Sequence, residues 1–333
     1  MATKPRITRR RFLIAGAGAL AGVTVAGGGT ASARFVQGSQ RVEEVWATTT
    51  VAKLEKIGTV KRLVILPLVE WYTGRDDLVG EPGLSYLVRA DDTTILFDVG
   101  FNLQQQHPSP LLRNAAALGV DLQNIDALVI SHPHTDHIGG ASQVSLSGQP
   151  VDLGSVPAYL PCEIGCPTSQ KVVVEGPRLL APGVASLGII PRQDFVFGWT
   201  PEQSLAVNVA GKGIVLVVGC GHPTIQRIVE RAEALFAEPL YGVVGGLHFP
   251  VTDSRAKLLG IPAQKSLGTG KWPWDPINQD DVRSAIAFLQ ARRPQLVALS
   301  AHDSCDWSIE AFRQAFAEAH REVRVGREIV VES

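Results

Sequence analysis

The residues with the clearest capacity for chemistry stand in one short segment, Ser131–Gly140, which reads SHPHTDHIGG. An apolar run at 125–130 precedes it, so a buried strand would release the polar side chains into the turn at its carboxyl end. Neutral imidazole nitrogens and carboxylate oxygens suit zinc, and also iron, manganese or nickel. The segment therefore predicts a metal site rather than a histidine-rich surface loop. The candidate ligands are His132, His134, Asp136 and His137.

This segment resembles the signature of the metallo-β-lactamase superfamily of metallohydrolases. The resemblance implies two divalent metal ions, with zinc expected first. It assigns His132 and His134 to the first ion, and Asp136 and His137 to the second.

Three further histidines share one sequence context. His222, His248 and His302 each follow an apolar run that is typical of a buried strand. A single histidine at a strand end is more often structural than a ligand. Three of them, beside the metal segment, favour a common site at one edge of the sheets.

The spacing of these later histidines narrows the resemblance. Gly-Cys-x-His at 219–222, Gly-Gly-x-His at 245–248 and a late His–Cys pair are similar to one branch of the superfamily. That branch is named for dihydropterin ribofuranosyl-aminobenzene phosphate synthase, and the likeness spans about residues 60–330. It implies that His222 completes the first metal site, that His302 completes the second, and that His248 contacts substrate or an oxyanion.

The same resemblance gives roles to an acid and a thiol. It implies that Asp98 supports the metal loop from behind and orients an imidazole, although a strand-end aspartate can also simply cap the next turn. Cys220 occupies the slot where the superfamily often has a bridging aspartate. It is expected either to bridge the metals as a thiolate or to be a small buried residue behind His222. The branch usually follows its last histidine with Cys-Thr-Gly, whereas here Asp303 and Ser304 follow His302, which puts the substrate in doubt.

Two loops are candidates for substrate selection. The first, at 70–75, carries Trp71, Tyr72 and Arg75. The second, rich in Gly and Pro, carries Trp272 and Trp274 and could form a lid. Packing of the tryptophans and a solvated arginine are the alternatives.

The elements that must position these residues follow from apolar runs and turn signals. Strands are expected at 61–69, 84–88, 93–97, 128–130, 205–209, 214–218, 240–244 and 296–299. Helices are expected at 108–118, 225–236, 282–289 and 311–319, while 150–200 is dense in Pro and Gly and resists interpretation. The pattern is α/β or α+β, and the resemblance implies a four-layer αββα sandwich.

The amino terminus is predicted to be a targeting segment. Thr8–Leu13 resembles a twin-arginine export signal, a weakly apolar stretch follows it, and Ala31–Ala33 offers a cleavage site. We expect a signal peptide at 1–33, a polar lead-in at 34–60 and a hydrolase domain at 61–333. The mature protein would then work outside the cytoplasm, without a stable membrane span, after passing the twin-arginine machinery. An exported protein can form disulfides, and a Cys162–Cys166 bond is slightly favoured over free thiols.

Composition limits the substrate. Residues 1–33 hold five basic residues and no acid, which leaves 26 Lys and Arg against 32 Asp and Glu in the rest of the chain. A mildly acidic body without a basic run argues against nucleic acid. We therefore expect a dinuclear hydrolase in which a metal-bridging hydroxide attacks a small ester, amide or phosphate-containing molecule, with Asp136 accepting a proton. The alternatives are a lactonase or β-lactamase-like hydrolase, or a non-catalytic binding protein of the same fold.

Overall fold

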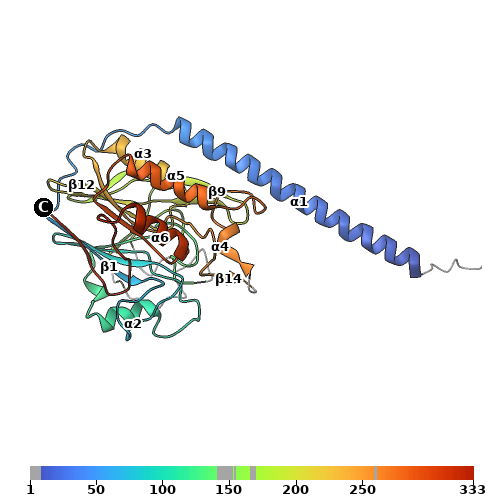
Figure 1. Ribbon diagram of the computed structural model, residues 1–333, viewed down its shortest axis with the longest axis horizontal. Coiled ribbons are helices and arrows are strands. Elements are labelled where there is room, and N and C mark those ends of the chain that lie inside the picture. The colour runs from blue at the N-terminus through green and yellow to red at the C-terminus, as the bar shows by residue number, and fades with distance from the viewer. Residues whose placement is uncertain (1–8, 141–152, 154, 166–169, 259–260) are drawn as a thin grey trace, which may run out of the picture.

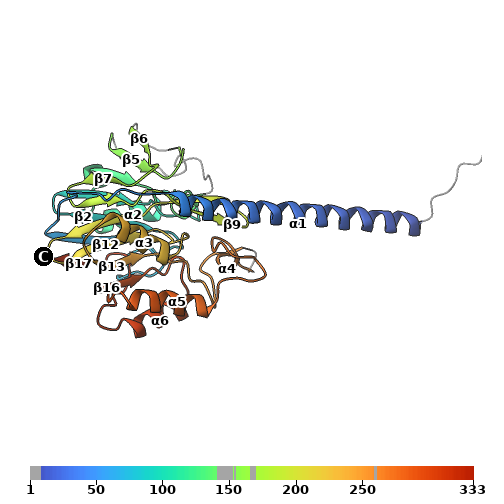
Figure 2. The same cartoon turned by 90° about the horizontal axis from the view of Figure 1, so that it is seen from above.

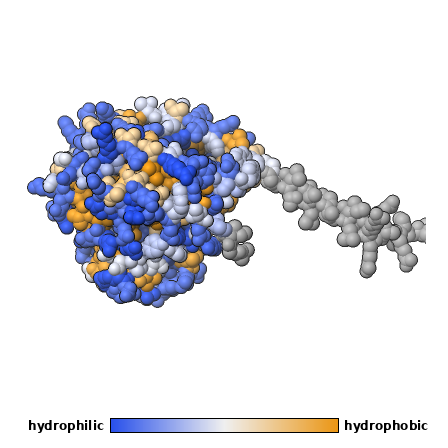
Figure 3. All heavy atoms as spheres, viewed as in Figure 1, coloured by the Kyte–Doolittle hydropathy of each residue, from blue (hydrophilic) through white to orange (hydrophobic). Residues whose placement is uncertain are grey.

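The computed structural model describes residues 9–140, 153, 155–165, 170–258 and 261–333. Two β-sheets lie face to face, with helices on their outer faces (Figures 1 and 2). The α/β class and the four-layer αββα arrangement are therefore confirmed. One face of the molecule is largely hydrophilic, with smaller apolar areas between the polar side chains (Figure 3).

The first sheet has seven strands in the order β17-β1-β2-β3-β4-β5-β6. Its β17, β1, β2 and β3 pair antiparallel, whereas β3, β4, β5 and β6 pair parallel. In chain order the strands are β1 (Arg62–Val69), β2 (Ser85–Ala90), β3 (Thr93–Phe97), β4 (Ala127–Val129), β5 (Pro157–Leu160), β6 (Gln170–Val173) and β17 (Ile329–Glu332).

The second sheet has six strands in the order β16-β13-β12-β11-β8-β7. Its β16, β13 and β12 pair parallel, and the other neighbours pair antiparallel. The strands are β7 (Arg178–Ala181), β8 (Val184–Ser186), β11 (Leu205–Val209), β12 (Gly213–Val218), β13 (Leu240–Gly245) and β16 (Leu296–Leu299). Two short hairpins stand apart, β9 (Ile190–Asp194) with β10 (Gly198–Glu202), and β14 (Lys257–Leu258) with β15 (Ile261–Pro262).

Side chains that alternate between the two faces of a strand explain why apolar clusters form both between the sheets and under the helices. In β12, Val215 and Val217 pack in the cluster between the sheets, while Ile214, Leu216 and Val218 pack under the helices. Side chains that alternate between two apolar layers leave no polar face, which is why the whole strand is buried. The helices are α2 (Pro110–Ala117) on the first sheet, α3 (Ile225–Leu235), α5 (Gln279–Gln290) and α6 (Asp306–Ala315) on the second, and the short α4 (Ala263–Ser266) and 3₁₀ helix η1 (Leu122–Asn124).

Local signals account for the helix ends. Ser109 caps α2 by accepting a hydrogen bond from the backbone N–H of Leu112, and Pro110 is the first helical residue. The expected strands and the first two helices are confirmed, most within a residue or two of their bounds. The helix predicted at 311–319 was wrong in its bounds, because α6 begins directly after Cys305 and ends at Ala315. Within the described residues, six short strands, β5 to β10, also lie in or overlap the segment 150–200 that the sequence left uninterpreted.

The amino-terminal helix differs most from expectation. α1 (Arg9–Thr48) is 40 residues long, and its first part projects from the body (Figure 1). Its end packs on the body, with Phe35 only 4% and Val42 2% exposed. The polar lead-in expected at 34–60 is thus partly a packed helix, because its apolar residues recur at helical spacing. No helix within the described residues combines the length and apolar character that crossing a membrane requires.

The strand ends gather the candidate site. β3 and β4 are parallel neighbours in the first sheet, and β12, β13 and β16 are parallel neighbours in the second. The carboxyl ends of parallel strands meet at one edge, so the loops that follow these five strands lie together. Those loops carry Asp98, the 132–137 segment, Cys220 with His222, His248, and His302.

Candidate metal centre

Among the described residues, three overlapping groups of potential ligands form where these loops meet, and two of them contain the predicted ligands. Within each group the ligand atoms all lie within 4.8 Å of one another. The distant histidines reach the motif as predicted: Nε2 of His222 lies 3.1 Å from Nε2 of His132, and the rings of His137 and His302 are 5.2 Å apart. The first group is His132, His134 and His222, and the second is Asp136, His137, Cys220 and His302.

Cys220 stands at the centre of this arrangement. Its Sγ lies 3.1 Å from Nε2 of His137 and 3.2 Å from Nε2 of His302. It also belongs to a third overlapping group with His222 and His248. Of the two sequence interpretations, a small residue behind His222 does not describe this position, because the sulfur faces the other ligand atoms.

In four of these imidazoles Nδ1 makes a hydrogen bond with a residue outside the ligand groups, which fixes the orientation of the ring. Nδ1 of His222 lies 2.6 Å from the carbonyl oxygen of Gly268, so it must donate a hydrogen there. Nδ1 of His132 lies 2.9 Å from Oγ of Ser131, whose own hydrogen goes to Asp98. In neutral rings of this tautomer Nε2 carries a lone pair. The other two contacts join His137 to Asp98 and His302 to Ser300, each at 2.6 Å.

These hydrogen bonds test whether the site suits metal ions. The Nε2 atoms of His132 and His222 face each other at 3.1 Å with a lone pair each, which repel unless a cation lies between them. Nε2 of His134 is buried and has no hydrogen-bond partner within the described part of the chain. Imidazole, carboxylate and thiol donors in this arrangement fit divalent ions such as zinc.

Burial keeps most of these rings neutral. It lowers the pKa of His132, His222 and His302 well below the usual value, and that of His134 to about 3. Burial also lowers the pKa of His137, but Asp136 and Asp98 outweigh it and raise that pKa to about 9. His137 is thus the ring that most needs to release a proton before it can bind a metal.

Asp98 makes the imidazole contact predicted for it. Its Oδ2 accepts from Nδ1 of His137 and from Oγ of Ser131, while its Oδ1 accepts from the Ser131 N–H at 2.6 Å. The carboxylate is fully buried, so these contacts replace its hydration. Asp98 thereby fixes one ring of each ligand group.

Two buried glutamates were missed by the sequence interpretation. Glu70, at the end of β1, accepts hydrogen bonds from Ser300 at 2.5 Å and from Tyr86 at 3.0 Å. Glu202, at the end of β10, accepts from the backbone N–H groups of residues 220, 221 and 222. Burial raises the pKa of Glu202 to about 7. Position at a strand end was the only signal in the sequence, because the partners come from distant loops.

His248 lies beside the ligands, and hydrogen bonds to the 264–267 segment set the orientation of its ring. Its Nε2 contacts two carbonyl oxygens, of Leu267 at 2.7 Å and of Gln264 at 3.1 Å, so Nε2 carries the hydrogen. Nδ1 is then an acceptor, and it has no hydrogen-bond partner in the described residues. The neutral ring therefore has no free N–H for the oxyanion role that the resemblance implied, whereas a contact with a substrate donor remains open to it.

The aromatic and basic residues expected to select substrate lie elsewhere. Arg75 pairs with Asp77 and its side chain is 48% exposed. The guanidinium of Arg255 lies over the rings of Trp71 and Tyr72, and Tyr72 donates to Asp306. Trp272 and Trp274 stack on each other, with Trp272 against Phe35. None of the five expected residues lines either cavity described below.

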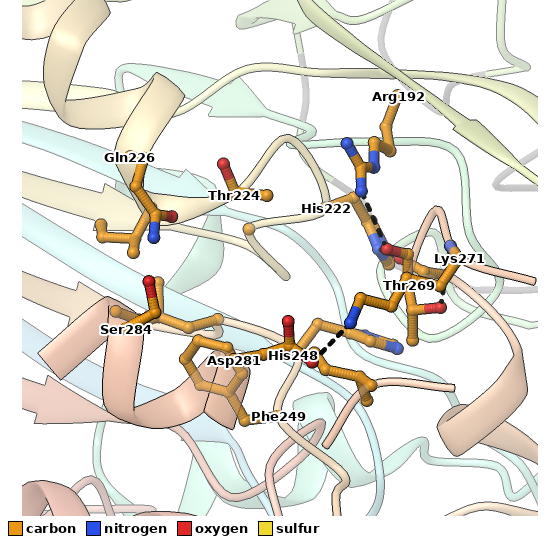
Figure 4. Close-up of a pocket in the computed structure, with 16 residues that line it drawn as sticks. Arg192, His222, Thr224, Gln226, His248, Phe249, Thr269, Lys271, Asp281 and Ser284 are labelled. Carbon is orange, nitrogen blue, oxygen red and sulfur yellow. Dashed lines mark hydrogen bonds and ion pairs between the residues drawn. The ribbon is translucent and has the colours of Figure 1, made fainter. Parts of the chain in front are cut away.

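Two cavities adjoin the ligand groups and share His222, His248 and Gly268. One, of about 150 Å³, opens above His134, Asp136 and Cys220. The other, of about 120 Å³, lies beside the start of α3, with Arg192 and Lys271 in its wall (Figure 4). Gly268 has φ +76°, and a Cβ there would come within 2.6 Å of His222 and 2.9 Å of His248, so only glycine fits between them.

Of the expected cysteine pair, Cys162 is a free thiol, and Cys166 lies outside the described residues. The predicted disulfide therefore stays a prediction.

Comparison with known proteins agrees with the fold. Residues 78–159 match the sequence model of the metallo-beta-lactamase superfamily. The chain is 27% identical to the 7,8-dihydropterin-6-methyl-4-(beta-D-ribofuranosyl)-aminobenzene-5'-phosphate synthase of Methanocaldococcus jannaschii, over 66% of this chain and 88% of that protein. A shorter match, 34% identical, covers 27% of this chain and 29% of ribonuclease Z from Mycobacterium bovis.

Among solved structures, a metal-dependent hydrolase of the beta-lactamase superfamily aligns with a TM-score of 0.57 and 20% identity. The alignment covers 81% of this chain and all of that one. This chain accordingly has the metallo-beta-lactamase fold, with candidate ligand groups at the strand ends, and its sequence is similar to that of the Methanocaldococcus synthase.

Proposed function

We propose that this protein is a hydrolase that holds two divalent metal ions, with zinc as the first candidate. One observation carries the proposal: the Nε2 atoms of His132 and His222 face each other with a lone pair each. Their Nδ1 atoms are hydrogen-bonded on the opposite side of each ring. A purely structural packing of histidines would satisfy Nε2 with protein acceptors or donors. Here the Nε2 atoms of His132 and His222 face one another, and those of His137 and His302 face Sγ of Cys220.

In this proposal the two ligand groups hold one ion each. His132, His134 and His222 would bind the first ion, and Asp136, His137 and His302 the second. Cys220 would contact the second ion, and as a thiolate it could contact both, since its sulfur lies within 4.8 Å of ligand atoms of both groups. Asp98, Ser131 and Gly268 would orient the rings without touching the metals.

Bound divalent ions would acidify a water molecule toward a pKa of about 7 and polarise the oxygen under attack. The chain's own part is to position and to exchange protons. Asp136 lines the cavity with its side chain 18% exposed, so its carboxylate can accept a proton released there. His248 offers Nδ1 as a second acceptor at the cavity wall. The reaction class is hydrolysis of a small ester, amide or phosphate-containing molecule.

Metal content and turnover measured together test this proposal. The purified protein should contain close to two divalent ions per chain and hydrolyse at least one member of an ester and phosphodiester panel. His132→Ala and Asp136→Ala should each lose an ion and most of the activity, while His107→Ala, exposed and outside both groups, should lose neither. Full metal content without hydrolysis of any panel member would favour a binding protein of the same fold.

We further propose that the protein is exported by the twin-arginine route and processed near Ala33. The proposal is supported by the Thr8–Leu13 motif and by the packing that directly follows Ala33. Arg34 donates to the carbonyl of Val196, and Phe35 is buried against Phe195. A fusion of residues 1–40 to a folded reporter should leave the cytoplasm, and an Arg9→Lys/Arg10→Lys variant should stay inside. Export that persists in the double variant would remove this idea.

A further inference from the structure

The cavity above the ligand groups is walled by apolar side chains. Its lining includes Pro82, Phe101, Phe197 and Leu267 beside the ligands. Phe197 is 45% exposed, and its ring centroid lies 4.7 Å from that of His134. An exposed phenylalanine beside a polar site gains nothing in the free protein, and exposed apolar surface of this kind marks ligand-binding grooves.

The apolar wall is held in place by a specific set of hydrogen bonds. Oδ1 of Asp194 accepts from the backbone N–H groups of Val196 and Phe197 at 2.7 and 2.8 Å. Its Oδ2 accepts from the N–H of Gly268. One carboxylate thus joins the tip of the β9–β10 hairpin to the loop that orients His222. Phe197 is therefore fixed relative to the ligand groups rather than free to fold away.

Cations are missing from this wall. No Lys or Arg lines the cavity among the described residues, and the internal undescribed segments 141–152, 154, 166–169 and 259–260 contain neither residue type. Two basic side chains, Arg192 and Lys271, line the neighbouring cavity and are engaged there. Arg192 donates to Thr269 and Lys271 pairs with Asp281 at 2.6 Å (Figure 4).

A charged phosphate group beyond the scissile bond needs cationic or several N–H partners in a buried site. An acyl chain needs only apolar contact. Resting on the proposed function, we infer that the substrate is an uncharged carboxylic ester, lactone or amide whose acyl group is apolar and packs on Phe197 and Phe101. Diphosphates and esters that carry a further phosphate group are excluded as the preferred class.

A substrate series with one leaving group tests this inference. The zinc-loaded protein is assayed with 4-nitrophenyl acetate, butyrate, hexanoate and octanoate, with bis(4-nitrophenyl) phosphate and with 4-nitrophenyl phosphate. We expect kcat/KM to rise with chain length, by up to about fourfold for each buried methylene, and to be lowest for the phosphate monoester. A flat ester series, or a preference for either phosphate, would overturn the inference.

Substitutions test whether the preference for long acyl chains depends on Phe197. Phe197→Ala should reduce the octanoate-to-acetate ratio, whereas Leu179→Ala, which truncates an exposed leucine on β7, should leave that ratio unchanged. Phe197→Lys should supply the missing cation and shift the preference toward 4-nitrophenyl phosphate. Equal ratios in the wild type and Phe197→Ala would contradict the assignment.

Binding measurements without turnover test the apolar site independently of the proposed hydrolase activity. Octanoate, acetate and inorganic phosphate are titrated into the zinc-loaded protein by calorimetry. Octanoate should bind at least tenfold more tightly than acetate, and the gain should fall in Phe197→Ala. If octanoate is preferred but no panel member is hydrolysed, the hydrolase proposal fails and the apolar site stands. If acetate binds as tightly as octanoate, the apolar site fails whatever the turnover.

Discussion

Oγ of Ser300 lies 2.5 Å from Oε2 of Glu70, and neither side chain reaches solvent. Ser300 has one hydroxyl hydrogen, which goes to the carboxylate, so its oxygen accepts from Nδ1 of His302. Nε2 of His302 then keeps its lone pair, 3.2 Å from Cys220. The same order of imidazole, serine and buried carboxylate joins His132, Ser131 and Asp98.

Glu70→Gln should therefore weaken metal binding at the second ligand group. In the wild type both the Trp71 N–H and the Ser300 hydroxyl donate to Glu70. The new amide nitrogen is itself a donor, so it must face one of these two donors. If the Ser300 hydroxyl rotates, it donates its hydrogen bond to Nδ1 of His302. The imidazole must then carry its own hydrogen on Nε2, where it would block metal binding. We expect a loss of about 10- to 100-fold in affinity for one of two ions, measured by titrating the metal-free protein.

Tyr86→Phe is the matched control for this variant. It removes another hydrogen bond to Oε2 of Glu70, at 3.0 Å, and leaves the contact between Ser300 and His302 intact. It should lower the free energy of unfolding by about 1 kcal/mol without changing metal affinity. Equal effects of both variants on the metal would mean that Glu70 acts only through stability.

Cobalt substitution distinguishes the thiols. If Cys220 binds metal, the cobalt-loaded protein should show sulfur-to-cobalt charge-transfer absorption in the near ultraviolet, and Cys220→Ser should abolish it. Cys305→Ser should retain the band. Although burial raises the pKa of Cys305, hydrogen bonds with Ser308 and Thr252 lower it to about 7, yet this thiol belongs to neither ligand group. A band that survives in Cys220→Ser would exclude Cys220 as a ligand.

Metal removal should destabilise the folded protein. Without ions the facing lone pairs of His132 and His222 are left unopposed, whereas ions present at 1,000 times their Kd would add about 4 kcal/mol to stability. A chelator should therefore lower Tm, and zinc should restore it. His132→Ala should show a much smaller zinc-dependent shift, and an equal shift in that variant would place the stabilising ion elsewhere.

Asn114 connects α2 to the end of β1 and to the loop that follows this strand. Its Nδ2 donates to the carbonyls of Leu68 and Val79, and its Oδ1 accepts from the Val79 N–H, all at 2.8 Å. Asn114→Ala leaves these three backbone groups without partners and should cost about 3 kcal/mol in chemical denaturation. Asn124→Ala, at an exposed asparagine whose side chain donates to Asp121, should cost less than about 1 kcal/mol.

Much of the candidate site could be predicted because its residues carry local signals. His222, His248 and His302 each follow a strand with a clear apolar run, and parallel neighbours then bring the strand ends together. The strands at Thr93–Phe97, Leu205–Val209 and Leu296–Leu299 match their predicted ranges for the same reason. Short strands such as β7 (Arg178–Ala181) have few buried positions and give no comparable signal.

What could not be predicted depends on pairing between distant loops. The role of Glu70 exists only because the end of β1 meets Ser300 at the end of β16, 230 positions later. Phe197 looks like an ordinary hairpin residue until its ring is found beside His134. The aromatic residues Trp71 and Tyr72 suggested a substrate loop by composition, but Arg255 from another loop covers them.

Anomalous diffraction at the zinc edge, from crystals of the zinc-loaded protein, tests the dinuclear site most directly. Two peaks should appear, one at about 2.0–2.3 Å from ligand atoms of His132, His134 and His222, the other at that distance from Asp136, His137 and His302. No peak among these side chains, or a lone peak away from both groups, would contradict the proposed metal centre.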